Sequence, residues 1–264
     1  NYSYYDRICG ALAVYNSTLV AGGIFYRAAH FGLPHLAGWN GVTWNAFAPD
    51  LGPAYDVFGF TTYNDRLVAL GAFPNAGSTA TNFIAAWDST RWQPLGSGAD
   101  YLLYAGAEYN GDLIIGGTFS SMGGVACSNV ARWNGTSWAP LGSGVDGWVR
   151  TLFVWNGKLF AGGEFRNAGG HSAPYFAQWD GTQWSAPATA PNSDVSALGE
   201  WHGHLIVGGM FTNIAGISAS GMAEFDGATW TPLGAGVSGG RYGPQDPVSI
   251  TTFQNDLIVG GDFT

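Results

Sequence analysis

The stretch WNGKLFAGGEF, residues 155–165, decides the fold, because its pattern recurs along the whole chain. The pattern is an aromatic residue, a turn usually begun by Asn, an apolar strand, two glycines, one variable residue and Phe. It occurs, with variations, at residues 15–25, 63–73, 109–119, 155–165, 201–211 and 253–263. The second glycine is Gly23, Gly71, Gly117, Gly163, Gly209 and Gly261, so successive copies are 48, 46, 46, 46 and 52 residues apart. A period of this length indicates a repeat fold.

A second pattern follows the first and pairs two aromatic residues around a turn. Its five copies carry Trp39 and Trp44, Trp87 and Trp92, Trp133 and Trp138, Trp179 and Trp184, and Phe225 and Trp230. The turn between them is usually Asn-Gly or Asp-Gly, which tolerates the positive φ of tight hairpins. Each pattern therefore predicts a β-hairpin. Two hairpins per repeat predict a four-stranded antiparallel blade, the unit of a β-propeller.

We therefore predict an all-β fold in which residues 1–264 form a single six-bladed propeller domain. The expected blades are residues 1–52, 53–98, 99–144, 145–190, 191–236 and 237–264. The last blade has its first hairpin only, so we expect it to be incomplete within this chain. A part of a seven-bladed propeller is the alternative. An unfinished blade also suggests that the chain belongs to a longer protein or an assembly.

The double glycine, followed by an aromatic residue and then a Trp, resembles the kelch motif. Relatives of this motif occur in the propeller of galactose oxidase and in secreted bacterial surface proteins. The resemblance extends over essentially the whole chain. It departs from the kelch pattern in two ways: the first aromatic is Trp or Phe where kelch usually has Tyr, and the aromatic pair is only five residues apart. The resemblance implies a propeller fold and little about function, because propellers host unrelated activities.

Composition argues against several classes of partner. Only 10% of residues are charged, the net charge is −9, and Lys158 is the single lysine. A nucleic-acid surface needs clustered Lys and Arg, so we expect no nucleic-acid partner. No apolar run approaches the ~20 residues that span a bilayer, so we expect no membrane insertion. The low charge and the sequons at Asn1, Asn16 and Asn134 favour a secreted or cell-surface protein. Cys9 and Cys127 are out of register in the repeat, so we expect no disulfide.

The repeat separates packing residues from candidate ligand contacts. Nine of the 12 tryptophans occupy the paired positions, and Trp155 and Trp201 occupy the aromatic position before the turn. Trp148 alone falls outside these positions, so it is the strongest candidate for ligand contact. The loops that lead into the first strand of each blade vary between repeats and offer further aromatic, acidic and Arg side chains. The predicted ligand-binding residues are Trp148, Arg150, Tyr101, Tyr104, Tyr55, Asp56, Asp194, Tyr242 and Asp246.

Other clusters fit packing or solvent exposure better than catalysis. His202 and His204 fall at a hairpin turn on the opposite face. Glu164 and Asp262 hold the same position in alternate blades, which keeps the two carboxylates apart. Cys9 and Cys127 do not fit a copper centre of the galactose oxidase kind. We therefore predict no metal site, no cofactor and no catalytic residue.

The expected role is binding or scaffolding outside the cell or at its surface. The expected ligand is a glycan, a peptide or a neighbouring domain, bound by the loops that enter the inner strands. A glycan-active enzyme or an oxidoreductase with an axial site is one alternative. A purely structural component of an extracellular assembly is the other.

Overall fold

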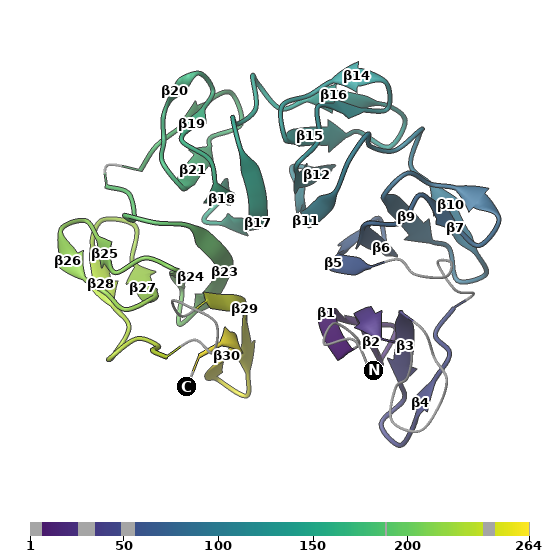
Figure 1. The fold of residues 1–264 in the computed structure, drawn as a ribbon, viewed down its shortest axis with the longest axis horizontal. Helices are drawn as coiled ribbons and strands as arrows, with labels where there is room; N and C mark the ends of the chain where they lie inside the picture. Colours follow the sequence, from purple (N-terminus) through teal and green to yellow (C-terminus); the bar gives the residue numbers. More distant parts are fainter. Residues whose placement is uncertain (1–6, 26–34, 49–55, 188, 240–245, 264) are drawn as a thin grey trace, which may run out of the picture. The chain divides into compact units, whose positions relative to one another are not determined.

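The fold was analysed in a computed structural model, which describes residues 7–25, 35–48, 56–187, 189–239 and 246–263. These residues form strands, turns and loops, and the strands assemble into small antiparallel sheets (Figure 1). The chain divides into two compact units, Asn1–Pro140 and Leu141–Thr264.

The first unit contains three four-stranded blades. Each follows the predicted order of two hairpins, with the first pattern forming strands one and two and the second pattern forming strands three and four. The strands of blade one are β1 (Arg7–Tyr15), β2 (Thr18–Phe25), β3 (Leu36–Trp39) and β4 (Trp44–Asn45). Those of blade two are β5 (Val57–Tyr63), β6 (Arg66–Gly71), β9 (Ile84–Trp87) and β10 (Trp92–Pro94). Those of blade three are β11 (Leu103–Tyr109), β12 (Asp112–Gly117), β15 (Val130–Trp133) and β16 (Trp138–Pro140).

The second unit contains two four-stranded blades and one separate hairpin. Blade four consists of β17 (Trp148–Trp155), β18 (Lys158–Glu164), β21 (Phe176–Trp179) and β22 (Trp184–Ser185). Blade five consists of β23 (Val195–Trp201), β24 (His204–Gly209), β27 (Met222–Phe225) and β28 (Trp230–Pro232). The hairpin pairs β29 (Asp246–Phe253) with β30 (Asp256–Asp262).

The number of blades corrects the sequence prediction. The described residues form five four-stranded blades, so the predicted six-bladed propeller, and the seven-bladed alternative, are wrong. The sixth copy of the first pattern folds into the two-stranded sheet β29–β30. A four-stranded blade needs both patterns, and the chain has five copies of the aromatic-pair pattern.

Short two-stranded ribbons, which the sequence reading did not predict, lie between strands two and three of four blades. They pair β7 (Asn75–Ala76) with β8 (Thr79–Ala80), β13 (Ser121–Met122) with β14 (Val125–Ala126), β19 (Asn167–Ala168) with β20 (His171–Ser172), and β25 (Asn213–Ile214) with β26 (Ile217–Ser218). Single bridges tie three of these ribbons to the loop that enters the first strand of the same blade. We call this end of a blade, where its first strand begins, the leading end. The opposite end, where a tight turn joins strands one and two, is the turn end.

First strands of neighbouring blades pack together within each unit. In the first unit β5 contacts both β1 and β11, and in the second β23 contacts both β17 and β29 (Figure 1). The double glycine permits this packing. A Cβ on Gly162 would collide with Val195 of blade five, and a Cβ on Gly163 would collide with the backbone of Trp148 in its own blade.

The aromatic pairs join the third and fourth strands of each blade and pack against each other, as the repeat predicts. Their ring centroids lie 5.6 Å apart for Trp39 and Trp44, 5.3 Å for Trp87 and Trp92, 5.1 Å for Trp133 and Trp138, 5.5 Å for Trp179 and Trp184, and 4.7 Å for Phe225 and Trp230. Two of these indoles also donate hydrogen bonds to residues outside their own sheets. Trp138 Nε1 donates to the Leu95 carbonyl (2.7 Å), and Trp184 Nε1 donates to the Leu141 carbonyl (2.9 Å).

In blades one, two, four and five, the aromatic residue before the first turn donates a hydrogen bond to the turn of the following hairpin. Tyr63 Oη donates to the Gly111 carbonyl (3.3 Å), and Trp155 Nε1 donates to the Gly203 carbonyl (3.0 Å). Buried Tyr and Trp need such a partner for their polar atom. Packing thus accounts for these aromatic residues, as the repeat predicted.

Candidate functional site

A β-bulge recurs near the start of every first strand. In blade four Val149 pairs with Gly163 and Thr151 pairs with Gly162, which leaves Arg150 as the extra residue between them. The same register shift occurs in β1, β5, β11, β23 and β29. The extra residues are Gly10, Phe58, Tyr104, Arg150, Ser196 and Val248. Bulges redirect a side chain and often border functional sites, so the leading end presents one variable position from each blade.

In blade four the bulge organises three side chains, which we call the Trp148 cluster: Trp148, Arg150 and Glu164. Trp148 opens β17 and pairs with Glu164, the last residue of β18. Arg150 Nε donates to Glu164 Oε1 (2.7 Å), and Arg150 Nη2 contacts the same oxygen. The Arg150 Cζ lies 5.4 Å from the centroid of the Trp148 ring. The indole is nevertheless 46% exposed.

The chemistry of the Trp148 cluster suits a polar ligand with an apolar face. The exposed indole offers a flat surface for stacking. The Arg150–Glu164 pair is only half-buried, with side-chain exposures of 32% and 33%. Its remaining N–H groups and carboxylate lone pairs can therefore reach a ligand.

In the first unit the bulge positions of neighbouring blades meet. Phe58 of β5 and Tyr104 of β11 stack with ring centroids 5.2 Å apart and an interplanar angle of 27°. Tyr101, which precedes β11, is 55% exposed. The leading end of this unit therefore also carries aromatic surface.

Asp56 and Asp194 hold equivalent positions directly before β5 and β23. Their backbone carbonyls accept hydrogen bonds from Ala72 N–H (2.8 Å) and Met210 N–H (3.0 Å). The repeat places Leu102 and Trp148 at the same position in blades three and four. Burial raises the pKa of the Asp56 carboxyl, and the charge of His35 opposes part of that rise. Trp148 thus stands where other blades carry a carboxylate or an aliphatic side chain.

The remaining predicted site residues are Tyr55, Tyr242 and Asp246. Tyr55 and Tyr242 lie outside the described residues. Asp246 begins β29, and only its backbone is described. The structure therefore brings Trp148 and Arg150 together, places Tyr104 beside Phe58, and locates Asp56, Tyr101 and Asp194 at leading ends of their own blades.

Two features of the leading ends escaped the sequence reading. The first is the β-bulge, which places Phe58 beside Tyr104. The other is a position just before the third strand that has positive φ in every blade: His35 (62°), Phe83 (75°), Asn129 (61°), Tyr175 (66°) and Gly221 (69°). Its carbonyl accepts the N–H of the second glycine of the same blade. Positive φ is costly for Phe and Tyr and tends to persist near functional sites. Alignment of the repeats would have shown which residues share the position, but not the φ.

Acidic residues at the leading ends of blades three and four have a structural role. Asp100 Oδ1 accepts Ser120 N–H (3.0 Å) and Ser121 N–H (3.1 Å), and Asp146 Oδ1 accepts Arg166 N–H and Asn167 N–H (both 2.8 Å). Desolvation acts to raise the pKa of both carboxyls, but these hydrogen bonds outweigh it and lower the pKa. Both carboxylates are therefore committed to holding the ribbon loops.

Within the described ranges, no group of three or more His, Cys, Asp or Glu side chains is arranged to hold a metal ion. His202 stacks on Trp201 with ring centroids 4.0 Å apart, whereas His204 Nδ1 lies 3.4 Å from Glu224 Oε2. Since the two imidazoles have different neighbours, they do not form a pair.

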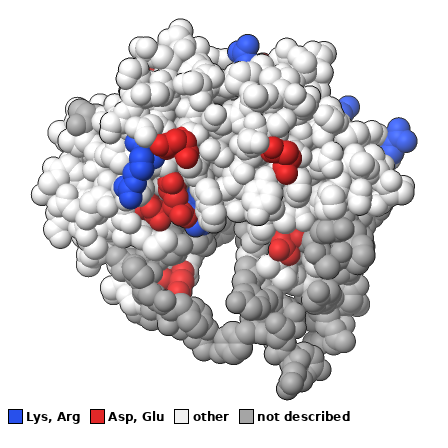
Figure 2. All heavy atoms as spheres, turned by 45° about the horizontal axis from the view of Figure 1, so that its top comes forward, with Lys and Arg blue, Asp and Glu red and all other residues white. Residues whose placement is uncertain are grey.

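The surface has few charges, as the composition implies. Figure 2 shows one face on which Lys, Arg, Asp and Glu side chains are sparse and most of the surface is uncharged. None of the described segments is a helix of the length and apolarity that crossing a membrane requires.

Comparison with known proteins supports the fold and assigns no family. No protein-family model matches the chain, and no curated protein matches it. Among solved structures, the chain is similar to the computationally designed Ika8 protein, with a TM-score of 0.59 and 13% sequence identity. The match covers 96% of this chain and 68% of the designed one. At this identity the likeness concerns the fold alone, and with the five blades it shows that the chain has a β-propeller fold.

Proposed function

We propose that this propeller is a binding module of a secreted or cell-surface protein, and that its leading end binds a glycan through the Trp148 cluster. The observation that carries the proposal is an indole that is 46% exposed beside an Arg–Glu pair. Every other indole in the chain has a packing position in the repeat. An exposed aromatic ring with polar partners is typical of sites that bind a ligand having both apolar and polar faces.

A glycan matches this chemistry better than a purely apolar ligand. The C–H face of a sugar ring can stack on the indole, while its hydroxyl groups exchange hydrogen bonds with guanidinium and carboxylate. The Phe58–Tyr104 stack and the exposed Tyr101 offer similar surface in the first unit. A peptide ligand and a neighbouring domain are the other occupants that a binding test must distinguish.

The extracellular location rests on composition and on the turn ends. The chain has one lysine and 10% charged residues. The sequon residues Asn16 and Asn134 are both exposed. The double-glycine pattern further supports a relationship with kelch-like repeats, which are common in secreted proteins.

A glycan array followed by calorimetry tests the proposal. We expect the wild-type chain to bind a defined glycan. Trp148→Ala should weaken that binding by at least about tenfold, since an aromatic ring that a bound ligand covers usually contributes much of the binding free energy. Trp148→Phe should retain part of the affinity. Phe253→Ala is the matched control, because it removes an exposed aromatic ring at a turn end.

Circular dichroism and thermal melts should show that the variants are folded. Equal affinity of wild type and Trp148→Ala would contradict the site. Binding of peptides, with no glycan bound by the folded chain, would contradict the ligand class.

A further inference from the structure

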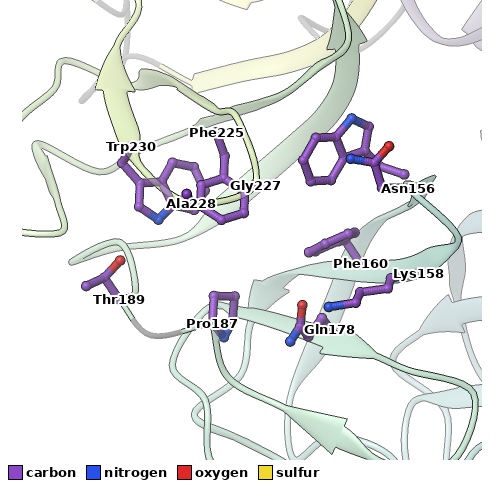
Figure 3. A pocket seen from close by; sticks show the side chains of 11 residues that line it. Asn156, Lys158, Phe160, Gln178, Pro187, Thr189, Phe225, Gly227, Ala228 and Trp230 are labelled. Carbon is purple, nitrogen blue, oxygen red and sulfur yellow. The ribbon is translucent and has the colours of Figure 1, made fainter.

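The second unit has a pocket at the turn ends of blades four and five. Its volume is about 360 Å³, within the range of small-molecule sites. Four aromatic side chains form much of its wall: Trp155 and Phe160 from blade four, and Phe225 and Trp230 from blade five. Figure 3 shows Lys158 and Gln178 on one side of the pocket, with Phe225 and Trp230 facing them from the other.

The same pocket is built a second time in the first unit. It has a volume of about 390 Å³ and lies at the turn ends of blades two and three. Its residues Tyr63, Asn64, Arg66, Trp133 and Gly135 hold the repeat positions of Trp155, Asn156, Lys158, Phe225 and Gly227. An aromatic wall, an Asn and a cation thus recur together.

The cations of these pockets differ from Asp112 and His204, which hold the same position in blades three and five. In blade three Asp112 pairs with Arg132 across the sheet (3.5 Å), and in blade five His204 pairs with Glu224 (3.4 Å). The corresponding neighbours of Arg66 and Lys158 are the uncharged Ala86 and Gln178. Within the described part of the chain, neither Arg66 nor Lys158 has an ion-pair partner. Each is therefore available to an anionic ligand.

Cations without an ion-pair partner beside aromatic walls are notable in this chain because it is acidic as a whole. The net charge is −9, and Lys158 is the single lysine. A single cation beside aromatic walls suits a ligand with one negative charge. A phosphate would be expected to recruit several donors, often a bidentate Arg together with further N–H groups.

We propose that these two pockets each bind one carboxylate-bearing sugar residue of an acidic polysaccharide. The carboxylate of the sugar pairs with Lys158 or Arg66. The apolar face of the ring lies against Trp230 and Phe225, or against Trp133. In the second unit, Asn156 and Gln178 exchange hydrogen bonds with the hydroxyl groups. This site is distinct from the Trp148 cluster, because Trp148 and Trp155 are at opposite ends of the same strand, β17.

Calorimetry with a galacturonic acid trisaccharide tests the proposal, with the neutral galactose trisaccharide as the control ligand. We expect two sites per wild-type chain, and affinity that falls as salt rises. Lys158→Gln and Arg66→Gln should each weaken one site by at least about tenfold, and the double variant should lose both. Lys158→Arg should retain binding. Arg91→Gln, which removes an exposed cation elsewhere, should change nothing.

The single lysine gives an independent readout. Amine-reactive labelling of Lys158 should slow in the presence of the acidic trisaccharide and not with the neutral one. Trp148→Ala should leave both readouts unchanged, so failure of the leading-end site would be distinguishable from failure of this one. Unchanged binding by the folded double variant, or equal binding of the neutral trisaccharide, would overturn the proposal. Equal binding of a short poly-glutamate peptide would overturn the assignment to sugars.

Discussion

Gly162 and Gly260 hold the same position of the repeat but have different surroundings. A Cβ on Gly162 would collide with Val195 of blade five, whereas a Cβ on Gly260 would approach only Ser249, at 3.9 Å. We therefore expect Gly162→Ala to lower the free energy of unfolding by about 1–3 kcal/mol, the usual cost of overpacking. Gly260→Ala should change it by less than about 0.5 kcal/mol.

Denaturant unfolding of both variants measures this difference. Equal effects of the two substitutions would show that neighbouring blades do not press on Gly162 as the structure describes. A loss confined to Gly162→Ala would confirm that packing between blades four and five requires a glycine at this position.

Single-residue roles were predictable where the repeat fixes them. The nine tryptophans of the aromatic pairs pack as expected, because a hairpin of known register places each ring against its neighbour. The bulge at Arg150 was not predictable, because it depends on which residues pair across two strands. For the same reason the sequence did not show that Glu164 pairs with Arg150, or that Phe58 occupies a bulge position.

Carboxylates in the turns between strands three and four make the stability of the fold depend on pH. Asp180 Oδ1 accepts Thr182 N–H (2.8 Å) and Gln183 N–H (2.9 Å), and Asp226 Oδ1 accepts Ala228 N–H and Thr229 N–H (both 2.7 Å). These hydrogen bonds lower the pKa of each carboxyl to about 2. A lowered pKa in the folded state stabilises the fold above the unfolded pKa of about 3.9. We expect that contribution to be lost as pH falls from about 4 towards 2.

Thermal melts across this pH range provide the measurement, and the repeat supplies its own control. Asn40 and Asn134 hold the same position and make equivalent hydrogen bonds through Oδ1. The double variant Asp180→Asn/Asp226→Asn should therefore remain folded and show a smaller drop in Tm below pH 4. An identical pH dependence in wild type and variant would rule out these carboxylates as its source.

At the level of elements, the long hairpins were predictable and the short ribbons were not. Asn-Gly and Asp-Gly turns between apolar segments indicate hairpins directly. The ribbons such as β13–β14 have two residues per strand, which is too short for a strand period to show. The positive φ at Phe83 and Tyr175 was equally hidden, since these residue types do not indicate a left-handed conformation.

At the level of the whole molecule, the fold class was predictable and the number of blades was miscounted. The prediction counted copies of the double-glycine hairpin, of which there are six. The structure forms a four-stranded blade only where the aromatic-pair hairpin also occurs, which is five times. The fourth strand matters because its Trp packs against the aromatic residue of the third strand, as Trp138 does against Trp133 and Trp184 against Trp179. Counting complete pairs of hairpins would have predicted five.

Nuclear magnetic resonance of the Trp side chains can test the proposed binding site at the leading end of blade four. The indole N–H signal of Trp148 can be assigned from its loss in Trp148→Phe and followed while a neutral glycan that binds the chain is added. We expect this signal to shift along a saturable curve, while those of Trp138 and Trp184, which donate to backbone carbonyls in the core, stay in place. Saturable binding with an unmoved Trp148 signal would contradict a binding site at the leading end of blade four.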